Sequence, residues 1–236
     1  MDHILNLIGF SAQGWGTALL KGTWVTMQIS IGAFVVGIAI GLLAAVVKLR
    51  GSGVWYQIAK VYTTVCRAVP ELLLIIVLFY GGSSMISTFA AMLGMGEIEV
   101  AGLPVAILVL GLVQGAYSSE IFRGAIVSLN AGHIEAAKAY GLSGRKLFWR
   151  MTLPMMAPNV LAGLSNLWLN LIKDSALISV VGTNELLYTA KQAGGSTREY
   201  LVFFLTAAVI YYVITLISSY VLRRLELNLR RWQPKH

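Results

Sequence analysis

Two long stretches without a charged residue, 23–47 and 200–222, constrain this 236-residue chain more than any other feature. A helix needs about 20 mostly apolar residues to cross the hydrocarbon core of a bilayer, which is roughly 30 Å thick. Charged residues make up 12% of the sequence, which is about half their share in typical soluble domains. The sequence therefore predicts an all-α polytopic membrane protein, and it argues against both a soluble globular domain and a disordered chain.

Five segments of suitable length predict five membrane-spanning helices in a single domain that covers residues 1–236. The second is the least distinct, because the uncharged stretch continues beyond its outer end. In the first, Gly37 and Gly41 form a G-x-x-x-G pattern that permits close approach of a neighbouring helix, although glycine is common in membrane helices generally. The expected spans are residues 23–47, 61–81, 103–126, 155–181 and 200–222.

The basic residues predict how the chain is oriented. If the N-terminus is outside, the inner segments 48–67, 123–150 and 223–236 hold fourteen of the eighteen Lys and Arg residues. The positive-inside rule then places the C-terminus in the cytoplasm. The same assignment explains the net charge of +8 by membrane orientation, so no nucleic-acid partner is expected. The sequence starts without a basic segment, so a cleaved signal peptide is not expected.

The longest predicted inner connection, residues 127–154, has the composition of a docking element. Residues 134–140 favour a helix, Gly141 suits a left-handed helix end, and Ser143 can begin a second helix. Pro154 suits the first turn of the fourth span. Two short helices with apolar and basic faces would bind another protein, or would lie on the lipid surface as an amphipathic segment.

Three separated elements of this loop resemble the EAA loop of the permease subunits of bacterial ABC importers: Glu135-Ala136-Ala137, then Gly141, then Leu153-Pro154. Met151 stands where isoleucine is usual. Three further segments resemble signatures of the polar amino-acid permeases, namely RAVPE at 67–71, GAYSSEIFRG at 115–124 and KDSALIS at 173–179. In the first of these, Ala68 replaces the usual glycine. The likeness extends from about residue 14 to residue 231 and is greatest to the Q-type permeases for histidine, arginine and opines.

This resemblance implies a type I ABC importer permease with the MetI-like fold, in the bacterial inner membrane. It also implies four kinds of contact: a second, related permease subunit, two ATPase subunits, an external substrate-binding protein and an amino-acid substrate. The EAA-like residues would then lie in a groove of an ATPase and couple ATP hydrolysis to alternating access. The sequence contains no G-x-x-x-x-G-K-[ST] phosphate-binding loop, so ATP and Mg²⁺ are expected on the ATPase and no cofactor is expected on this chain.

Ionisable residues inside a predicted span are costly to insert and mark functional sites by default. Glu71 lies ten residues into the second span, about 15 Å deep at 1.5 Å per residue, and follows Pro70 directly. Asp174 lies toward the outer end of the fourth span. Both are candidate substrate-binding carboxylates. The alternatives are an ion pair of Glu71 with Arg67 one turn earlier, and a subunit contact or an outer vestibule for Asp174.

Three more residues complete the candidate substrate site. Glu120 shares a helix face with Arg123, so it either contacts the ligand or forms an ion pair at the inner gate. Tyr117 offers a ring and a hydroxyl to a polar cavity, or it is an aromatic residue of the membrane interface. Ser175 follows Asp174 in the segment that resembles the family signature. The three histidines are scattered along the sequence, so neither a metal site nor a catalytic group is expected.

The membrane carboxylates favour a basic amino acid or an opine as the substrate, because a cationic side chain needs a negative partner of its own. The main alternative is an ion-coupled secondary amino-acid transporter, which also places carboxylates in the membrane. Such transporters often contain inverted repeats, and no internal repeat is visible here. An intramembrane enzyme would need a nucleophile and base, or metal ligands, at membrane depth. A scaffold role would leave Glu71 and Asp174 unexplained.

Overall fold

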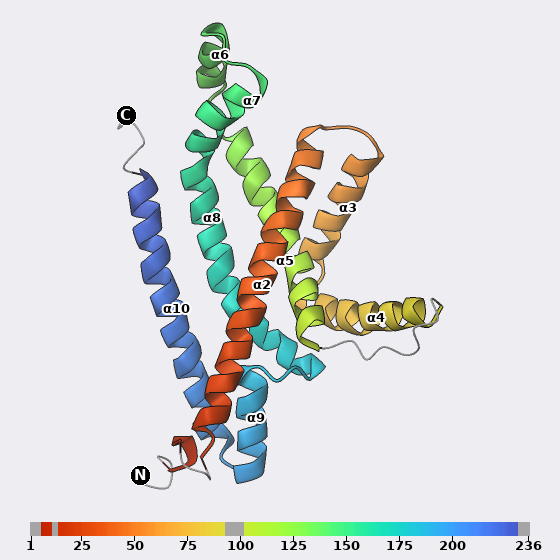
Figure 1. Cartoon of the computed structure of the whole chain (residues 1–236), viewed down its shortest axis with the longest axis vertical. Helices are drawn as coiled ribbons and strands as arrows, with labels where there is room; N and C mark the ends of the chain where they lie inside the picture. Colours follow the sequence, from red (N-terminus) through yellow and green to blue (C-terminus); the bar gives the residue numbers. More distant parts are fainter. Residues whose placement is uncertain (1–5, 11–13, 93–101, 231–236) are drawn as a thin grey trace.

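The structure is a computed structural model that describes residues 6–10, 14–92 and 102–230, and every regular element within these ranges is a helix. The helices form an elongated bundle from which two short helices project at one end (Figure 1). The prediction of an all-α protein is confirmed. Arg231 and Lys235, which contribute to the predicted inner side, lie outside the described residues.

Two long helices, α2 (Gly16–Leu49) and α5 (Gly102–Val127), form the central pair of the bundle. Gly37 and Gly41 lie where α2 meets α5. A Cβ atom added at Gly41 would lie 2.5 Å from the Cβ atom of Ser118, which is closer than two carbon atoms can approach. The structure therefore contains the close helix contact, which was one of the two interpretations of the G-x-x-x-G pattern left open by the sequence.

Helix α5 contributes glycines to the same contact. A Cβ atom at Gly111 would lie 2.6 Å from Val36 Cγ1, and one at Gly115 would lie 2.8 Å from Ile40 Cγ2. The missing side chains let the β-branched residues of α2 fit against the α5 backbone. We call this contact the glycine seam; it consists of Gly37, Gly41, Gly111 and Gly115.

The second predicted span is broken by a sharp bend. Helix α3 (Val54–Ala68) and helix α4 (Glu71–Met92) are bent by 119° relative to each other. Val69 is extended, with φ −89° and ψ 140°, as expected for a residue that precedes proline. Pro70 cannot donate a backbone hydrogen bond to continue α3. Residues 61–81 therefore do not form the single continuous helix that the sequence predicted.

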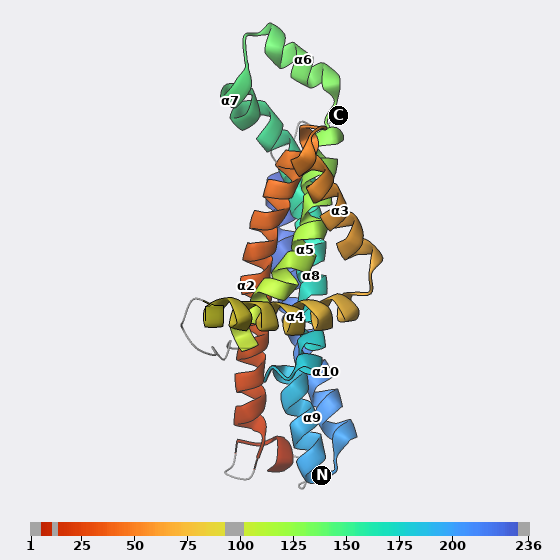
Figure 2. The ribbon, with the colours of Figure 1, turned by 90° about the vertical axis from the view of Figure 1, so that its right-hand side faces the viewer.

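Helix α4 lies across the long axis of the other helices (Figure 2). Large apolar side chains on it are exposed in the single chain, including Leu73, Val77, Tyr80 and Met85. Because this helix is apolar around its circumference, it needs lipid or another protein to cover it.

The fourth predicted span begins as α8 (Leu153–Asp174) and continues as a 3-10 helix, Ser175–Val181. The 3-10 helix ends at Gly182, whose φ of 84° lies in the left-handed region. The expected span of residues 155–181 is thus helical throughout, but it changes helix type at Asp174. That change places the Asp174 side chain at the junction of two differently wound segments.

Helices α9 (Leu186–Thr197) and α10 (Tyr200–Arg230) complete the bundle and are joined through a buried carboxylate. Glu185 is fully buried and accepts a hydrogen bond from the Tyr188 backbone amide at 2.7 Å, which caps the start of α9. The Tyr211 hydroxyl of α10 donates to the same carboxylate at 2.7 Å. The N-terminal partial charge of α9 adds to this stabilisation.

The two projecting helices belong to the predicted inner loop. They are α6 (Ala131–Ala139) and α7 (Gly144–Leu147), and a single π-helical turn, Phe148–Thr152, connects α7 to α8. Gly141, with φ of 81°, reverses the chain between α6 and α7. Ser143 is the N-cap residue of α7. The two-helix loop with a glycine turn is therefore confirmed.

Three helices are long and apolar enough to cross a membrane: α2, α5 and most of α10. The bent pair α3–α4 adds a fourth crossing if both parts belong to one span. Helix α8 is not among them, and its sequence contains Asn159, Asn166 and Asn170. The predicted count of five spans is therefore not confirmed within the described residues. Polar side chains lower the hydropathy of α8, and the proline bend divides the second predicted span into two shorter helices.

The glycine seam leads to a testable prediction. We expect Gly41→Ala to destabilise the protein by about 1–3 kcal/mol, the usual cost of overpacking a tight contact. Gly124→Ala is the matched control on α5, because a Cβ atom at Gly124 meets nothing within 4 Å. The measurement is the thermal unfolding midpoint of each purified variant in detergent. Equal midpoints for the Gly41 and Gly124 variants would contradict the role assigned to the seam.

Candidate functional site

Asp174 and Gln114 meet between α8 and α5. Asp174 is the last residue of α8 and is half-buried, while Gln114 lies in the middle of α5 and is 3% exposed. The Gln114 Nε2 atom lies 3.5 Å from the Asp174 Oδ2 atom, at the limit for hydrogen bonding. Among the described residues, the buried Gln114 Oε1 atom has no hydrogen-bond partner. The amide thus has an unused acceptor inside the bundle.

Glu71 and Tyr117 lie beside this pair. Tyr117, Glu71 and Asp174 lie near enough to interact electrostatically, and the Arg67 guanidinium also acts on Tyr117. Glu71 reaches this position because it is the first residue of α4, directly after the Pro70 bend. A carboxylate in the first turn is also favoured by the partial positive charge of a helix N-terminus. We call Glu71, Gln114, Tyr117 and Asp174 the polar site.

The polar site has the chemistry to hold a cation with several hydrogen-bond donors. Two carboxylates accept charge-assisted hydrogen bonds from an ammonium or guanidinium group. The Gln114 amide offers both a donor and an acceptor, and the Tyr117 hydroxyl offers the same. Three helices meet here, which is where ligand sites form in helical bundles.

Lys173 adjoins Asp174 in the sequence but is exposed, whereas Asp174 is half-buried. The Lys173 side chain lines a different, mostly apolar pocket of about 460 Å³ with residues of α9 and α10, such as Phe204 and Tyr212. The two neighbours therefore lie in different surroundings.

Ser175 is completely buried, and its hydroxyl donates a hydrogen bond to the Ile172 carbonyl oxygen at 2.7 Å. This bond links the start of the 3-10 helix to the last turn of α8. A role for Ser175 in substrate binding stays a prediction.

Glu120 lies in a separate ionic cluster. It forms a salt bridge with Lys48 of α2, whose side chain is 6% exposed. The Arg123 Nη2 atom lies 3.0 Å from Glu120 Oε2, and the Arg67 Nη1 atom lies 3.9 Å from Glu120 Oε1. The structure therefore contains the Glu120–Arg123 ion pair, which was one of the two possibilities left open by the sequence.

The alternative pairing of Glu71 with Arg67 depends on a continuous helix between them. The bend at Pro70 removes the i, i+4 geometry, and Arg67 lies instead within reach of Glu120. Among the described residues, Glu71 forms no salt bridge. The Glu71 carboxylate interacts electrostatically with Tyr117 in the polar site instead.

The EAA-like residues lie in the projecting loop. Glu135 and Ala136 are exposed on α6, while Ala137 is 6% exposed and its carbonyl accepts a hydrogen bond from the Leu142 amide at 3.0 Å. The Gly141 turn makes this bond possible. Ala137 thus closes the loop on itself and leaves Glu135 facing outward.

Leu153 and Pro154 anchor the other end of this loop. Leu153 is half-buried against a core cluster that includes Phe122 and Met156. Pro154 lies in the first turn of α8, where its missing amide proton costs nothing. The sequence prediction for Pro154 is confirmed.

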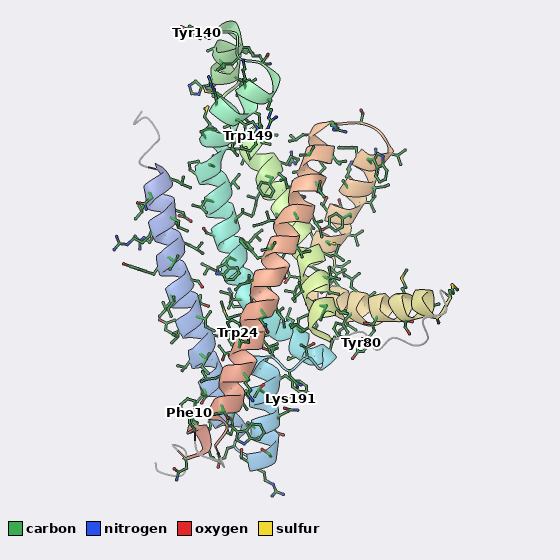
Figure 3. The ribbon with its side chains drawn as sticks, in the orientation of Figure 1. Phe10, Trp24, Tyr80, Tyr140, Trp149 and Lys191 are labelled. Carbon is green, nitrogen blue, oxygen red and sulfur yellow. The ribbon has the colours of Figure 1, made fainter. Side chains whose placement is uncertain are left out.

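Exposed aromatic side chains gather on the projecting loop. Tyr140 is 89% exposed, Trp149 is 57% exposed and Phe148 is 40% exposed. Tyr140 and Trp149 lie at the opposite end of the molecule from Phe10 and Lys191 (Figure 3). Aromatic residues on a protruding element are typical of protein interfaces.

Sequence reasoning missed two residues of these sites, Gln114 and Lys48. Gln114 is a polar residue inside an otherwise apolar span, and that signal was available in the sequence. Lys48 was counted only as a basic residue at a helix end. Its pairing with Glu120 joins positions 72 residues apart, so it depended on how α2 packs on α5.

Comparison with known proteins agrees with these features. The family described as "Binding-protein-dependent transport system inner membrane component" matches residues 37–231 of this chain. The octopine transport system permease protein OccQ of Rhizobium radiobacter is 40% identical over 227 residues, covering 96% of this chain and 95% of OccQ. The histidine/lysine/arginine/ornithine transport system permease protein HisQ of Escherichia coli is 36% identical over 213 residues, covering 90% of this chain and 93% of HisQ.

Solved structures show the same fold. An amino acid ABC transporter crystallised with histidines has a TM-score of 0.77 and 25% identity, covering 91% of this chain and 95% of that chain. The MetNI methionine ABC transporter in an inward-facing conformation has a TM-score of 0.72 and 19% identity, covering 89% and 95%. The MetI-like fold implied by the sequence resemblance is confirmed, and none of these proteins is described as an ion-coupled transporter. The chain therefore belongs to the family of binding-protein-dependent transport system inner membrane components, the permease subunits of ABC importers.

Proposed function

We propose that this permease subunit imports amino acids or opines with a basic side chain. The observation that carries the proposal is the polar site, in which two carboxylates, an amide and a phenol meet inside the bundle. A guanidinium or ammonium group fits the excess of negative charge there. The names of the relatives OccQ and HisQ, which refer to octopine and to histidine, lysine, arginine and ornithine, support the same substrate class.

ATP hydrolysis takes place on separate ATPase subunits that bind the projecting loop. The sequence contains no phosphate-binding loop of the G-x-x-x-x-G-K-[ST] type. The exposed Glu135 and Tyr140 offer a charge and an aromatic ring to a groove on such a partner. Closure of the two ATPase subunits would move the projecting loop together with α8, and this movement would switch the permease between inward-facing and outward-facing states.

A second permease subunit covers α4. This helix leaves the bundle and exposes Leu73, Val77 and Tyr80, which a protein neighbour would bury. A related subunit forming a heterodimer fits the likeness to the Q-type permeases, and a second copy of this chain is the alternative. An external binding protein delivers the substrate from the side opposite the ATPases.

The subunit lies in the bacterial inner membrane with its N-terminus outside and its C-terminus in the cytoplasm. The projecting loop and the end of α10 lie toward one end of the molecule, and the start of α2 lies at the other (Figure 1). The basic inner segments support this orientation.

Reconstituted transport tests the proposal as a whole. We expect vesicles that contain this subunit, its partner permease, the ATPase and the binding protein to accumulate arginine only when ATP is supplied. Uptake should persist when proton and sodium ionophores remove the ion gradients. Uptake that follows an ion gradient and needs no nucleotide would contradict the proposal and favour the secondary transporter.

The coupling loop has its own prediction. We expect Glu135→Lys to weaken ATPase binding, because it reverses an exposed charge on the docking helix, and to reduce ATP-driven uptake by about tenfold, or ~1.4 kcal/mol. The measurement is co-purification of the ATPase with the membrane-inserted permease, together with uptake. Glu226→Lys on α10 is the control, since it makes the same change outside the loop. Normal co-purification and uptake in the Glu135 variant would exclude a coupling role.

The polar site predicts selective loss of cationic substrates. We expect Asp174→Asn to lower arginine uptake by about tenfold or more, because a charge-assisted contact is replaced by a neutral one. Docking of the ATPase should be unchanged, since the 22 residues of α8 separate Asp174 from the loop by about 33 Å. Lys173→Gln serves as the neighbouring control, because that side chain lies in another pocket. Arginine uptake that stays normal in the Asp174 variant and falls in the Lys173 variant would contradict the assignment.

A further inference from the structure

A cavity of about 450 Å³ opens between α2, α3 and α5, and none of the four polar-site residues lines it. Four of its lining side chains are cationic and one is a carboxylate, so its wall carries an excess of three positive charges. We call it the cationic pocket. It is lined by Lys48, Tyr56, Lys60, Thr63, Thr64, Arg67, Ala68, Glu120 and Arg123.

The carboxylate in the pocket is already shared among the cations. Glu120 forms a salt bridge with the nearly buried Lys48, and both Nε and Nη2 of Arg123 lie 3.0 Å from Glu120 Oε2. Arg67 is 3.9 Å away from the other Glu120 oxygen. One carboxylate cannot neutralise this many cations held so close together, and like charges at such distances repel. The pocket therefore has capacity for a further anion.

The Lys48 end of the pocket lies at the depth of lipid headgroups on the side of the projecting loop. Helix α2 has 34 residues, so it is about 51 Å long at 1.5 Å per residue, which exceeds the roughly 40–45 Å of a bilayer with its headgroups. Lys48 directly follows the uncharged stretch 23–47 and therefore marks the edge of the hydrocarbon core. Helix α3 begins beside this end of α2 (Figure 1).

Helix α3 offers separate faces to the two parts of a lipid. Tyr56, Lys60 and Arg67 line the pocket at spacings of four and seven residues. Exposed apolar residues follow one another along α3 at spacings of four, three and four residues. Because each residue advances by about 100° around the helix, these residues share one face, opposite the residues that line the pocket. The apolar residues are Val54, Ile58, Val61 and Val65. A headgroup phosphate in the pocket would leave acyl chains beside this apolar face.

We propose that the cationic pocket binds a phosphate-bearing anion, supplied by the headgroup of an anionic phospholipid of the inner leaflet. Phosphate fits because Arg67 presents a forked donor and Lys60 an ammonium group, and Thr64 and Tyr56 offer hydroxyl groups in the same wall. Basic pockets between membrane helices on the cytoplasmic side are suited to such headgroups. A volume of about 450 Å³ lies within the usual range of ligand pockets. The inference depends on the proposed function only for the orientation in the membrane.

The test measures lipid retained by the intact transporter complex. The complex is purified in mild detergent, titrated with phosphatidylglycerol or with phosphatidylcholine, and the bound lipid is counted by native mass spectrometry. Lys60→Gln combined with Arg67→Gln removes two exposed pocket charges and spares the Lys48–Glu120 salt bridge. Arg50→Gln combined with Arg223→Gln removes two exposed charges outside the pocket and is the matched control.

We expect the wild-type complex and the control to retain phosphatidylglycerol in preference to phosphatidylcholine. The pocket variant should bind phosphatidylglycerol on the order of tenfold or more weakly, with an unchanged thermal unfolding midpoint. A parallel titration with inorganic phosphate distinguishes the source of the anion. If phosphate alone binds in a pocket-dependent manner and displaces the lipid, the anion site stands and its ligand comes from solution.

Three results would overturn the proposal. The pocket variant and the wild type could retain phosphatidylglycerol equally, or both double variants could lose it equally. The pocket variant could also lose the second permease subunit while its lipid binding stays unchanged. The last would mean that an acidic protein partner neutralises the pocket. The readout needs no transport, so it fails or succeeds independently of the ATP-driven uptake test.

Discussion

The close packing of α2 against α5 is the constraint on which the rest of the structure depends. Helices in a bilayer gain little from the hydrophobic effect, because lipid is as apolar as their own side chains, so close backbone contact has to hold them together. The glycine seam provides that contact over about one turn of each helix, because its glycines are four residues apart. It also aligns Gln114 and Tyr117 with the centre of the bundle and brings Lys48 onto Glu120. Both the polar site and the ionic cluster therefore follow from one packing geometry.

The bend at Pro70 decides how the charges are divided between these two places. If α3 continued straight into α4, Arg67 and Glu71 would lie on one face and neutralise each other. The bend sends Arg67 toward Glu120 and Glu71 toward Tyr117 and Asp174 instead. The result is a negatively charged site inside the bundle and a positively charged pocket near the end that carries the projecting loop. A cation and an anion would thus be held at different depths of the same subunit.

Regular secondary structure serves three different mechanical roles in this permease subunit. The long pair α2–α5 is the central frame, and α10 packs mainly against α8 and α9. Helix α4 extends beyond the frame with exposed apolar side chains, and α6 with α7 projects from one end with exposed aromatic side chains. The frame carries the polar site, whereas the two projecting elements offer surfaces to other subunits. This separation allows a movement of the loop to reach α8 directly, because the chain is helical from α7 through the π-helical turn into α8.

The sequence by itself determined the membrane class, the helical loop with its glycine turn, the close contact at Gly37 and Gly41, and the candidate residues Glu71, Tyr117 and Asp174. These depend on local chemistry: uncharged stretches, turn residues and small residues at helical spacing. Only the tertiary structure decided which of the charged residues meet. The partners of Glu120, the place of Gln114 beside Asp174 and the separation of Arg67 from Glu71 all follow from a sharp bend and from contacts between helices distant in the sequence. A periodic pattern along one helix contains no information about the angle of the next helix. The bend within residues 61–81 and the number of membrane spans therefore could not be predicted from the sequence pattern.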